Sequence, residues 1–265
     1  MRVGYAVQAI PTLASFRLRV DIPSKHLGCD YVIGKTGKPT FFYKDGYPDL
    51  AETIARAGDG VVWDVVNDHF QKKEYRQMAE VADAITCGSF AMADLIHSKT
   101  GRTATVIDDP FESEEKEPAC IGDGVCWFGH SANLPALLDY LQDIPMIVCS
   151  NYANSHVRWS LENEQKVLQG CAVALVCGTN PGASTNRIVK ALRAGRFVVV
   201  PEDCAESWKQ FEPFIWVGNV AEGVAWALNN REDVCSKILA GQSYIRQRFS
   251  PQSIGSQWGA LFGSI

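Results

Sequence analysis

The sequence has no large excess of charge of either sign, no long apolar run and no closely spaced cysteines. Its 265 residues include 25 lysines and arginines and 30 aspartates and glutamates, and the net charge of −5 gives no argument for a nucleic-acid partner. No apolar run approaches the roughly 18 residues of a membrane span, and the first seven residues predict a strand rather than a signal peptide. We therefore expect a cytoplasmic protein without a transmembrane segment.

Nine cysteines are scattered along the chain, and no two of them form a C-x-x-C pair. Some lie inside apolar stretches typical of strands, such as residues 173–177. An odd number of cysteines without metal-ligand spacing favours reduced thiols in a cytosolic core over a disulfide framework or a zinc site. We expect no bound metal and no cofactor.

The apolar and charged fractions, 46% and 21%, are those of a globular protein. Strand and helix patterns alternate along the chain in two series. The first series has predicted strands at 2–7, 31–33, 40–43, 60–66, 84–86 and 103–107, and predicted helices at 14–27, 49–57, 73–81 and 89–98. The second has predicted strands at 125–128, 146–149, 172–176, 197–200 and 214–217, and predicted helices at 133–141, 162–168, 184–194, 220–229, 232–249 and 252–262.

An acidic, proline-containing stretch at 108–118 separates the two series and is typical of a linker. Alternating strands and helices predict an α/β protein with parallel sheets covered on both faces. We expect two domains, at 1–118 and at 119–265, with the last helix a candidate to pack back on the first domain. In open parallel sheets ligands bind at the carboxyl ends of strands.

The loop before the predicted helix at 184–194 carries the clearest candidate site. It contains glycine and ends in hydroxyl and amide side chains next to an arginine. A helix start with unpaired N–H groups and a nearby positive charge suits a diphosphate. A simple helix cap at Ser184 is the structural alternative. The candidate residues are Gly182, Ala183, Ser184, Thr185, Asn186 and Arg187.

Further candidates follow other predicted strands. Gly129 ends a strand and would allow close approach of a ligand, and His130 after it is either a phosphate or sugar contact or a polar loop residue. Asp68 and His69 follow the strand at 60–66, where they could deprotonate or orient an acceptor, although a solvated loop histidine is the alternative. At the first strand-to-helix turn lie Ser15, Arg17 and Arg19; at most one of these two arginines is expected to face a ligand. Ser15 and Arg17 are the candidate ligand contacts of this turn.

These motifs together resemble the two-domain glycosyltransferases of the B fold, with family 4 the most similar. Residues 81–90 and 105–110 resemble the passage that closes the acceptor domain of that family. The turn at Ser15, residues 183–201 and residues 243–250 are similar to its first loop, its donor-site helix and its closing helix. The resemblance implies two Rossmann-like domains facing a central cleft, an acceptor-side domain at 1–118 and a nucleotide-sugar-binding domain at 119–265.

The resemblance also implies a nucleoside-diphosphate sugar as donor and a glycan, lipid-linked or small-molecule acceptor, without a metal. In that mechanism Arg187 stabilises the leaving diphosphate, while His69 and Asp68 act on the acceptor hydroxyl. The family's Glu-x7-Glu is absent, because Gly182 and Lys190 stand at its two acidic positions. Lys190, itself a candidate nucleotide contact, implies an altered nucleotide or sugar, a different partner for the ribose, or lost activity. Two alternatives remain: a catalytically silent nucleotide-sugar or glycan-binding protein, and a nucleotide-sugar epimerase.

Overall fold

The computed structural model describes residues 4–6, 14–28, 40–43, 48–49, 51–52, 60–119, 124–141, 143–179, 182–204 and 207–264. The strand expected at 31–33 and most of the helix expected at 49–57 lie outside these residues, as does the side chain of Ser15. Contacts divide the chain into two compact units. The first comprises Met1–Phe111, Pro181–Ser184 and Arg248–Ile265; the second comprises Glu112–Asn180 and Thr185–Gln247.

The first unit contains a parallel sheet whose described strands run in the order β1-β2-β3-β4-β5. Its strands are β1 (Gly4–Ala6), β2 (Thr40–Tyr43), β3 (Val61–Val65), β4 (Ala84–Cys87) and β5 (Thr105–Val106). All five residues of β3 are buried, because successive side chains enter the apolar layers on opposite faces of the sheet.

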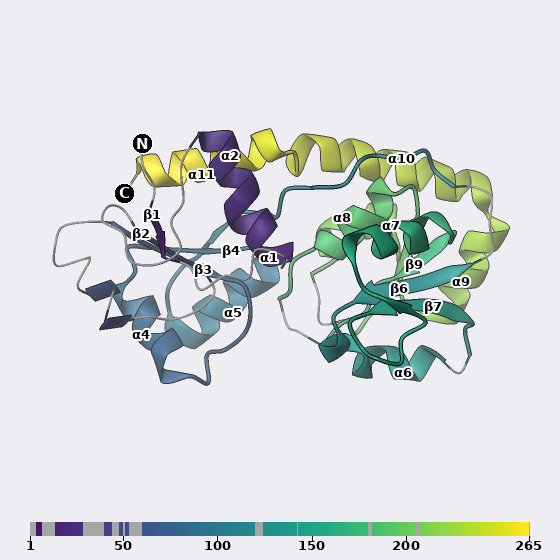
Figure 1. Ribbon diagram of the computed structural model, residues 1–265, viewed down its shortest axis with the longest axis horizontal. Coiled ribbons are helices and arrows are strands. Elements are labelled where there is room, and N and C mark those ends of the chain that lie inside the picture. The colour runs from purple at the N-terminus through teal and green to yellow at the C-terminus, as the bar shows by residue number, and fades with distance from the viewer. Residues whose placement is uncertain are drawn as a thin grey trace. The chain divides into compact units, whose positions relative to one another are not determined.

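Helices cover both faces of this sheet (Figure 1). They are α1 (Ala14–Phe16), continued by a π-helical turn (Arg17–Asp21) into α2 (Ile22–Leu27), and α4 (Lys73–Val81), α5 (Phe90–Thr100) and α11 (Pro251–Gly263). Trp63 packs with Tyr75 of α4 on one face. On the other face Val62 packs with Phe16 and Trp258, which come from α1 and α11. The first unit therefore has three layers, with the sheet in the middle.

The second unit contains a parallel sheet with the strand order β11-β10-β9-β6-β7-β8 in its described part. Its strands are β6 (Val125–Gly129), β7 (Met146–Ser150), β8 (Val157–Arg158), β9 (Val173–Leu175), β10 (Phe197–Val200) and β11 (Trp216–Val217). Its helices are α6 (Pro135–Leu141), α7 (Leu161–Gln169), α8 (Asn186–Arg193), α9 (Val220–Asn229) and α10 (Arg231–Arg248, whose last residue belongs to the first unit), with 3₁₀ turns at Ser131–Asn133 and Lys209–Phe214.

Most predicted elements are present, and the differences have local causes. The helix expected from residue 133 begins at Pro135, because proline lacks an N–H and fits the first helical position. The helix expected from Ser184 begins two residues later, at Asn186. The short strand β8 was not predicted, since two residues carry too little pattern to be recognised without their pairing partner in β7.

The cysteines differ from the sequence expectation at one position. The described cysteines at 87, 126, 149, 171, 177 and 204 are free, and five of them are buried. Cys235 is disulfide-bonded, so the expectation of reduced thiols is wrong for Cys235. Across the described part of the chain, no helix is both long and apolar enough to cross a membrane. The same residues hold no group of three or more histidine, cysteine, aspartate or glutamate side chains that could bind a metal.

Candidate functional site

The strand order of the second unit reverses direction between β6 and β9. From β6 the chain builds outward through β7 to β8, and then returns to the other side of β6 to build β9, β10 and β11. In an open parallel sheet the crevice at such a reversal, beyond the carboxyl ends of the strands, is the usual place for a ligand. The loops that follow β6 and β9 therefore define the candidate site.

Arg187, in the first turn of α8, brings a positive charge to this reversal point. Its Nη1 donates a hydrogen bond to the carbonyl of Phe128 at 3.0 Å, and its Nη2 donates one to the carbonyl of Cys177 at 2.7 Å. Its guanidinium lies over the Trp127 ring, 5.4 Å from the centroid. The side chain is 7% exposed. Arg187 thus joins the end of β6 to the segment that follows β9.

Gly129 makes this placement possible. A Cβ atom at Gly129 would lie 2.8 Å from Nη1 of Arg187 and 3.1 Å from the Trp127 ring. We expected Gly129 to allow close approach of backbone or ligand; the group that approaches it in the structure is the Arg187 guanidinium.

Hydrogen bonds connect the loops at the carboxyl edge of the sheet. His130 is exposed; its Nδ1 accepts from the amide of Ala132 at 3.2 Å, and its Nε2 lies 3.2 Å from Nδ2 of Asn151. The amide of Thr179 donates to Oδ1 of Asn133 at 3.2 Å. Asn133, where the sequence predicted a helix to start, ties the loop after β6 to the loop after β9, and His130 caps the 3₁₀ turn.

The residues before α8 differ in their surroundings. Thr185 precedes the helix, is 2% exposed and makes no side-chain capping hydrogen bond. Asn186 is half-buried as the first helical residue. Gly182, Ala183 and Ser184 lie outside the helix and belong by their contacts to the first unit. The structure therefore rules out Ser184 as the cap of α8.

Lys190 lies in a buried cluster of charges inside the second unit. Its Nζ is 2.8 Å from Oε1 of Glu164 and 3.3 Å from Oε1 of Glu112. Glu164 also accepts a hydrogen bond from Trp159 Nε1 at 2.8 Å. These contacts account for Lys190 at a position where the family resemblance leads us to expect an acid. The partner Glu164 was missed in the sequence because the two residues are 26 positions apart.

A second polar cluster lies at the carboxyl ends of β3, β4 and β5 in the first unit. Arg19 donates to both carboxylate oxygens of Asp64, with Nε 3.0 Å from Oδ2, and also to the carbonyl of Ile107. Thr86 Oγ1 donates to Oδ1 of Asp64 at 2.7 Å. Arg19 Nη1 is 3.4 Å from Oδ1 of Asp109. Burial raises the pKa of Asp109, although Arg19 opposes this effect.

The structure decides between the two arginines of the first helix. Arg17 is half-buried, whereas Arg19 is 2% exposed and lies in the cluster just described. Arg17 stays a predicted ligand contact, while Arg19 is the arginine that lies at the ends of the strands. The apolar neighbours Leu18 and Val20 are both buried, and they were the available signal that this part of the helix faces inward. The π-helical turn changes the helical period there, which obscures the pattern in the sequence.

Asp68 and His69 lie together in the loop after β3, as expected from the sequence. The carboxylate of Asp68 accepts from the amide of Phe70 at 3.2 Å, which shapes the loop. The half-buried ring of His69 meets the Tyr75 ring edge-on, with 5.4 Å between centroids. Both residues thus occupy the carboxyl end of a central strand in the first unit.

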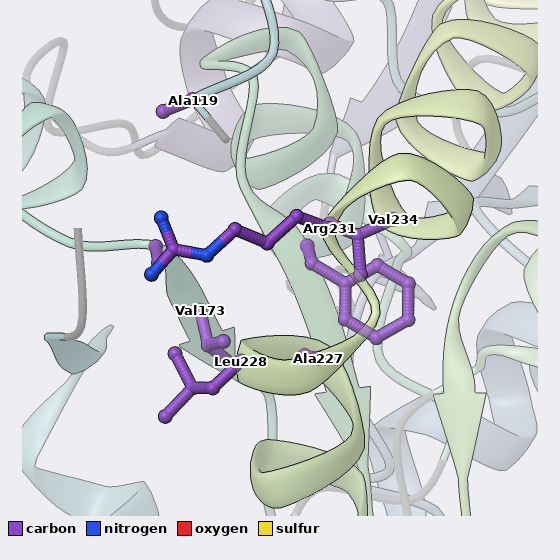
Figure 2. A pocket seen from close by; sticks show the side chains of 8 residues that line it. Ala119, Val173, Ala227, Leu228, Arg231 and Val234 are labelled. Carbon is purple, nitrogen blue, oxygen red and sulfur yellow. The ribbon is translucent and has the colours of Figure 1, made fainter. Parts of the chain in front are cut away.

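A shallow pocket lies at the amino ends of the strands of the second sheet, at the end opposite to the candidate site. Its wall includes Val173 and Phe197, the first residues of β9 and β10. In Figure 2 the Arg231 side chain extends along this pocket, and the other labelled residues are apolar. Because it lies at the amino ends of the strands, this pocket is separate from the candidate site.

No family model and no curated protein sequence matches the chain. Several solved structures match the chain. The structure of HepE from Anabaena with UDP-glucose has a TM-score of 0.75 at 12% identity, with 100% of both chains covered. TarM from S. aureus has a TM-score of 0.64 at 13% identity, with 84% of this chain and 55% of that chain covered. Sucrose-phosphate synthase from Thermosynechococcus elongatus has a TM-score of 0.59 at 10% identity, with 85% and 73% covered.

At these identities the comparisons establish the fold. It is the glycosyltransferase B fold, built from two Rossmann-like domains, as the sequence predicts. The strand order of the second unit, read from β8 to β11, is the order of a dinucleotide-binding Rossmann domain.

Proposed function

We propose that the chain is a glycosyltransferase that transfers a sugar from a nucleoside-diphosphate donor to an acceptor hydroxyl. The observation that carries this proposal is the position of the Arg187 guanidinium, fixed by two backbone carbonyls where the strand order reverses. Three structures of HepE, which has the same fold, contain UDP, UDP with glucose, or UDP-glucose. The structure of TarM also contains UDP.

In the proposed donor site the diphosphate lies at the start of α8. The first amides of this helix, at Thr185 and Asn186, provide donors with a partial positive charge. Arg187 adds a full positive charge beside them. When the bond from sugar to phosphate breaks, negative charge grows on the departing diphosphate, and these groups stabilise it without a metal. Gly129 and His130 border the same strand ends and are proposed donor contacts.

In the proposed acceptor site His69 and Asp68 act on the hydroxyl that attacks the sugar. Both lie in the loop at the carboxyl end of β3, where a ligand of this sheet would bind. His69 would accept the proton of that hydroxyl or orient it by a hydrogen bond. A glycan, a lipid-linked sugar or a small alcohol each offers such a hydroxyl.

The test combines nucleotide binding with transfer. Wild-type protein is titrated calorimetrically with UDP, GDP, TDP, ADP and CMP, and donors of the nucleotide that binds are then assayed with an acceptor panel. Arg187→Ala should lose at least about 100-fold in transfer, because a charge at the leaving group is removed. Arg76→Ala, in the exposed face of α4, is the control. Full transfer by Arg187→Ala would contradict the donor site.

A second candidate is a nucleotide-sugar-binding protein without transferase activity. It is favoured by the two positions where the resemblance leads us to expect acids: Gly182 has no side chain, and Lys190 is paired with Glu164 and Glu112. Tight binding of one nucleotide diphosphate without turnover across the panel would support this candidate. Conversion of the donor without any acceptor, followed by NMR, would identify an epimerase.

A further inference from the structure

The segment that leads into α8 is anchored to the first turn of α5. Ser89 is fully buried and caps α5, where its Oγ accepts from the amide of Met92 at 3.1 Å. The same Oγ donates to the carbonyl of Gly182 at 2.7 Å. One hydroxyl therefore serves as acceptor for the helix and as donor for the segment before α8.

The backbone conformation and the surrounding space at position 182 favour glycine. Its φ of +72° lies in the left-handed region, which residues with a Cβ atom rarely adopt. A Cβ atom there would also lie 2.9 Å from both N and Cα of Met92. This close contact gives a physical reason for glycine at a position where the family resemblance leads us to expect glutamate.

Ser184 is held in the same unit. Its side chain opposes the rise in the pKa of Asp109 that burial causes, and its Cβ would be 3.4 Å from a Cβ atom added at Gly88. Asp109 is 5% exposed and contacts Arg19. The residues on both sides of Ala183 are therefore anchored to a buried polar network, and Thr185 follows directly.

We propose that Ser89 is a positioning residue for the donor site, because its hydroxyl fixes the carbonyl of Gly182 and thereby the amides of Thr185 and Asn186. This inference rests on the proposed function, since it assumes that the diphosphate binds at those amides. A segment ordered before the ligand arrives loses less conformational entropy on binding. Ser89 itself does not touch the nucleotide in this scheme.

Two variants of equal size separate the two roles of the hydroxyl. In Ser89→Asn the amide can accept from Met92 N through Oδ1 and donate to Gly182 O through Nδ2. In Ser89→Asp the carboxylate still caps the helix but has no hydrogen to donate. Both side chains are larger than serine, so they share any steric cost. The measurements are made at pH 8 to keep the introduced carboxyl ionised.

The first measurement is amide hydrogen exchange of residues 183–186 without nucleotide, and the second is calorimetric affinity for UDP together with donor KM and kcat. We expect faster exchange in Ser89→Asp, about tenfold weaker UDP binding and higher donor KM with kcat little changed, as for the loss of one buried hydrogen bond. Ser89→Asn should remain close to wild type in each measurement. Melting temperatures of both variants report the integrity of the fold.

Wild-type exchange and affinity in Ser89→Asp would overturn the proposal. Equal losses in both variants would also overturn it, because the missing hydrogen would then not be the cause. If wild-type protein binds none of the nucleotide diphosphates, the proposed function fails and so does the role of Ser89 in affinity. The exchange measurement needs no nucleotide, so it still decides whether Ser89 anchors the segment.

Discussion

Gly129 and Arg187 are complementary: a Cβ atom on Gly129 would lie 2.8 Å from Nη1 of Arg187, closer than real Cβ contacts come. The guanidinium can therefore reach the carbonyl of Phe128 only because residue 129 has no side chain. This relationship connects a single glycine at the end of β6 with the charge that we propose for diphosphate binding.

Gly129→Ala should move the Arg187 guanidinium and weaken UDP binding by about tenfold, while overpacking costs about 1 to 3 kcal/mol of stability. Calorimetric titration and urea denaturation measure the two effects. Gly170→Ala is the matched control, since a Cβ atom there would have contacts of 3.5 Å or more. Unchanged UDP affinity in Gly129→Ala would show that the position of the guanidinium does not matter for the nucleotide.

Arg19→Met should destabilise the protein by about 3 to 5 kcal/mol, because it leaves the buried carboxylate of Asp64 without its cation. The free energy of unfolding in urea measures this loss. In the double variant Arg19→Met, Asp64→Leu most of the stability should return, since the unpaired charge is gone. Arg17→Met, on a half-buried side chain, should cost less. A small loss in Arg19→Met would mean that Asp64 is compensated by other groups.

Asp109→Asn should change how stability depends on pH. Burial, opposed by Arg19, raises the pKa of Asp109 above its ordinary value of 3.8, so the folded protein binds this proton more tightly than the unfolded chain does. The contribution of Asp109 to the free energy of unfolding is therefore fully present below about pH 3.8 and is lost as pH rises through the raised pKa. Wild type should lose stability relative to Asp109→Asn over that window, measured by denaturation at a series of pH values.

Glu114→Gln is the control of opposite sign for this pH series. The exposed carboxylate of Glu114 accepts a hydrogen bond from Lys116, which lowers its pKa. The small contribution of Glu114 to stability is present above the ordinary pKa of this carboxyl and disappears as pH falls. If the stability of the wild type changed with pH in the same way as that of Asp109→Asn, a raised pKa at Asp109 would be contradicted.

Lys190→Met should also destabilise the protein by about 3 to 5 kcal/mol, because two nearby carboxylates lose their cation. Adding Glu164→Gln should recover part of this loss, so a double-mutant cycle in urea should show coupling between positions 164 and 190. Lys166→Met is the control, since its pair with Glu162 is exposed and solvent screens the attraction, so little stability should be lost. Additive effects at 164 and 190 would contradict the buried pair.

The family pattern alone would suggest restoring a glutamate at position 190. In this structure Lys190→Glu would bring a third carboxylate beside Glu164 and Glu112, so the variant is expected to be less stable than Lys190→Met. The contacts of Lys190 therefore give a physical reason for lysine at a position where the resemblance leads us to expect glutamate. The sequence alone shows the difference but not its cause.

The sequence by itself determined the elements whose signals are local. Apolar periodicity predicted α4 at Lys73–Val81 and α9 at Val220–Asn229 with their observed bounds, and the helix predicted from residue 89 begins at the observed cap of α5, Ser89. The alternation of strands and helices predicted an α/β protein with parallel sheets, and the resemblance to B-fold glycosyltransferases implied two Rossmann-like domains. These signals lie within a few residues of each other, because helix caps and side-chain periodicity depend on neighbours along the chain.

Only the tertiary structure decided which distant groups meet. It placed Arg19 rather than Arg17 beside Asp64, paired Lys190 with Glu164, and brought the hydroxyl of Ser89 to Gly182. It also moved the start of α8 from Ser184 to Asn186. These contacts depend on which elements of the fold lie next to one another, and the contact at Gly182 also depends on its left-handed backbone. None of this follows from residues adjacent in sequence. The diphosphate site near Ser184 that the sequence predicts thus becomes, in our proposal, a site at Thr185–Arg187 with Ser184 in its anchor.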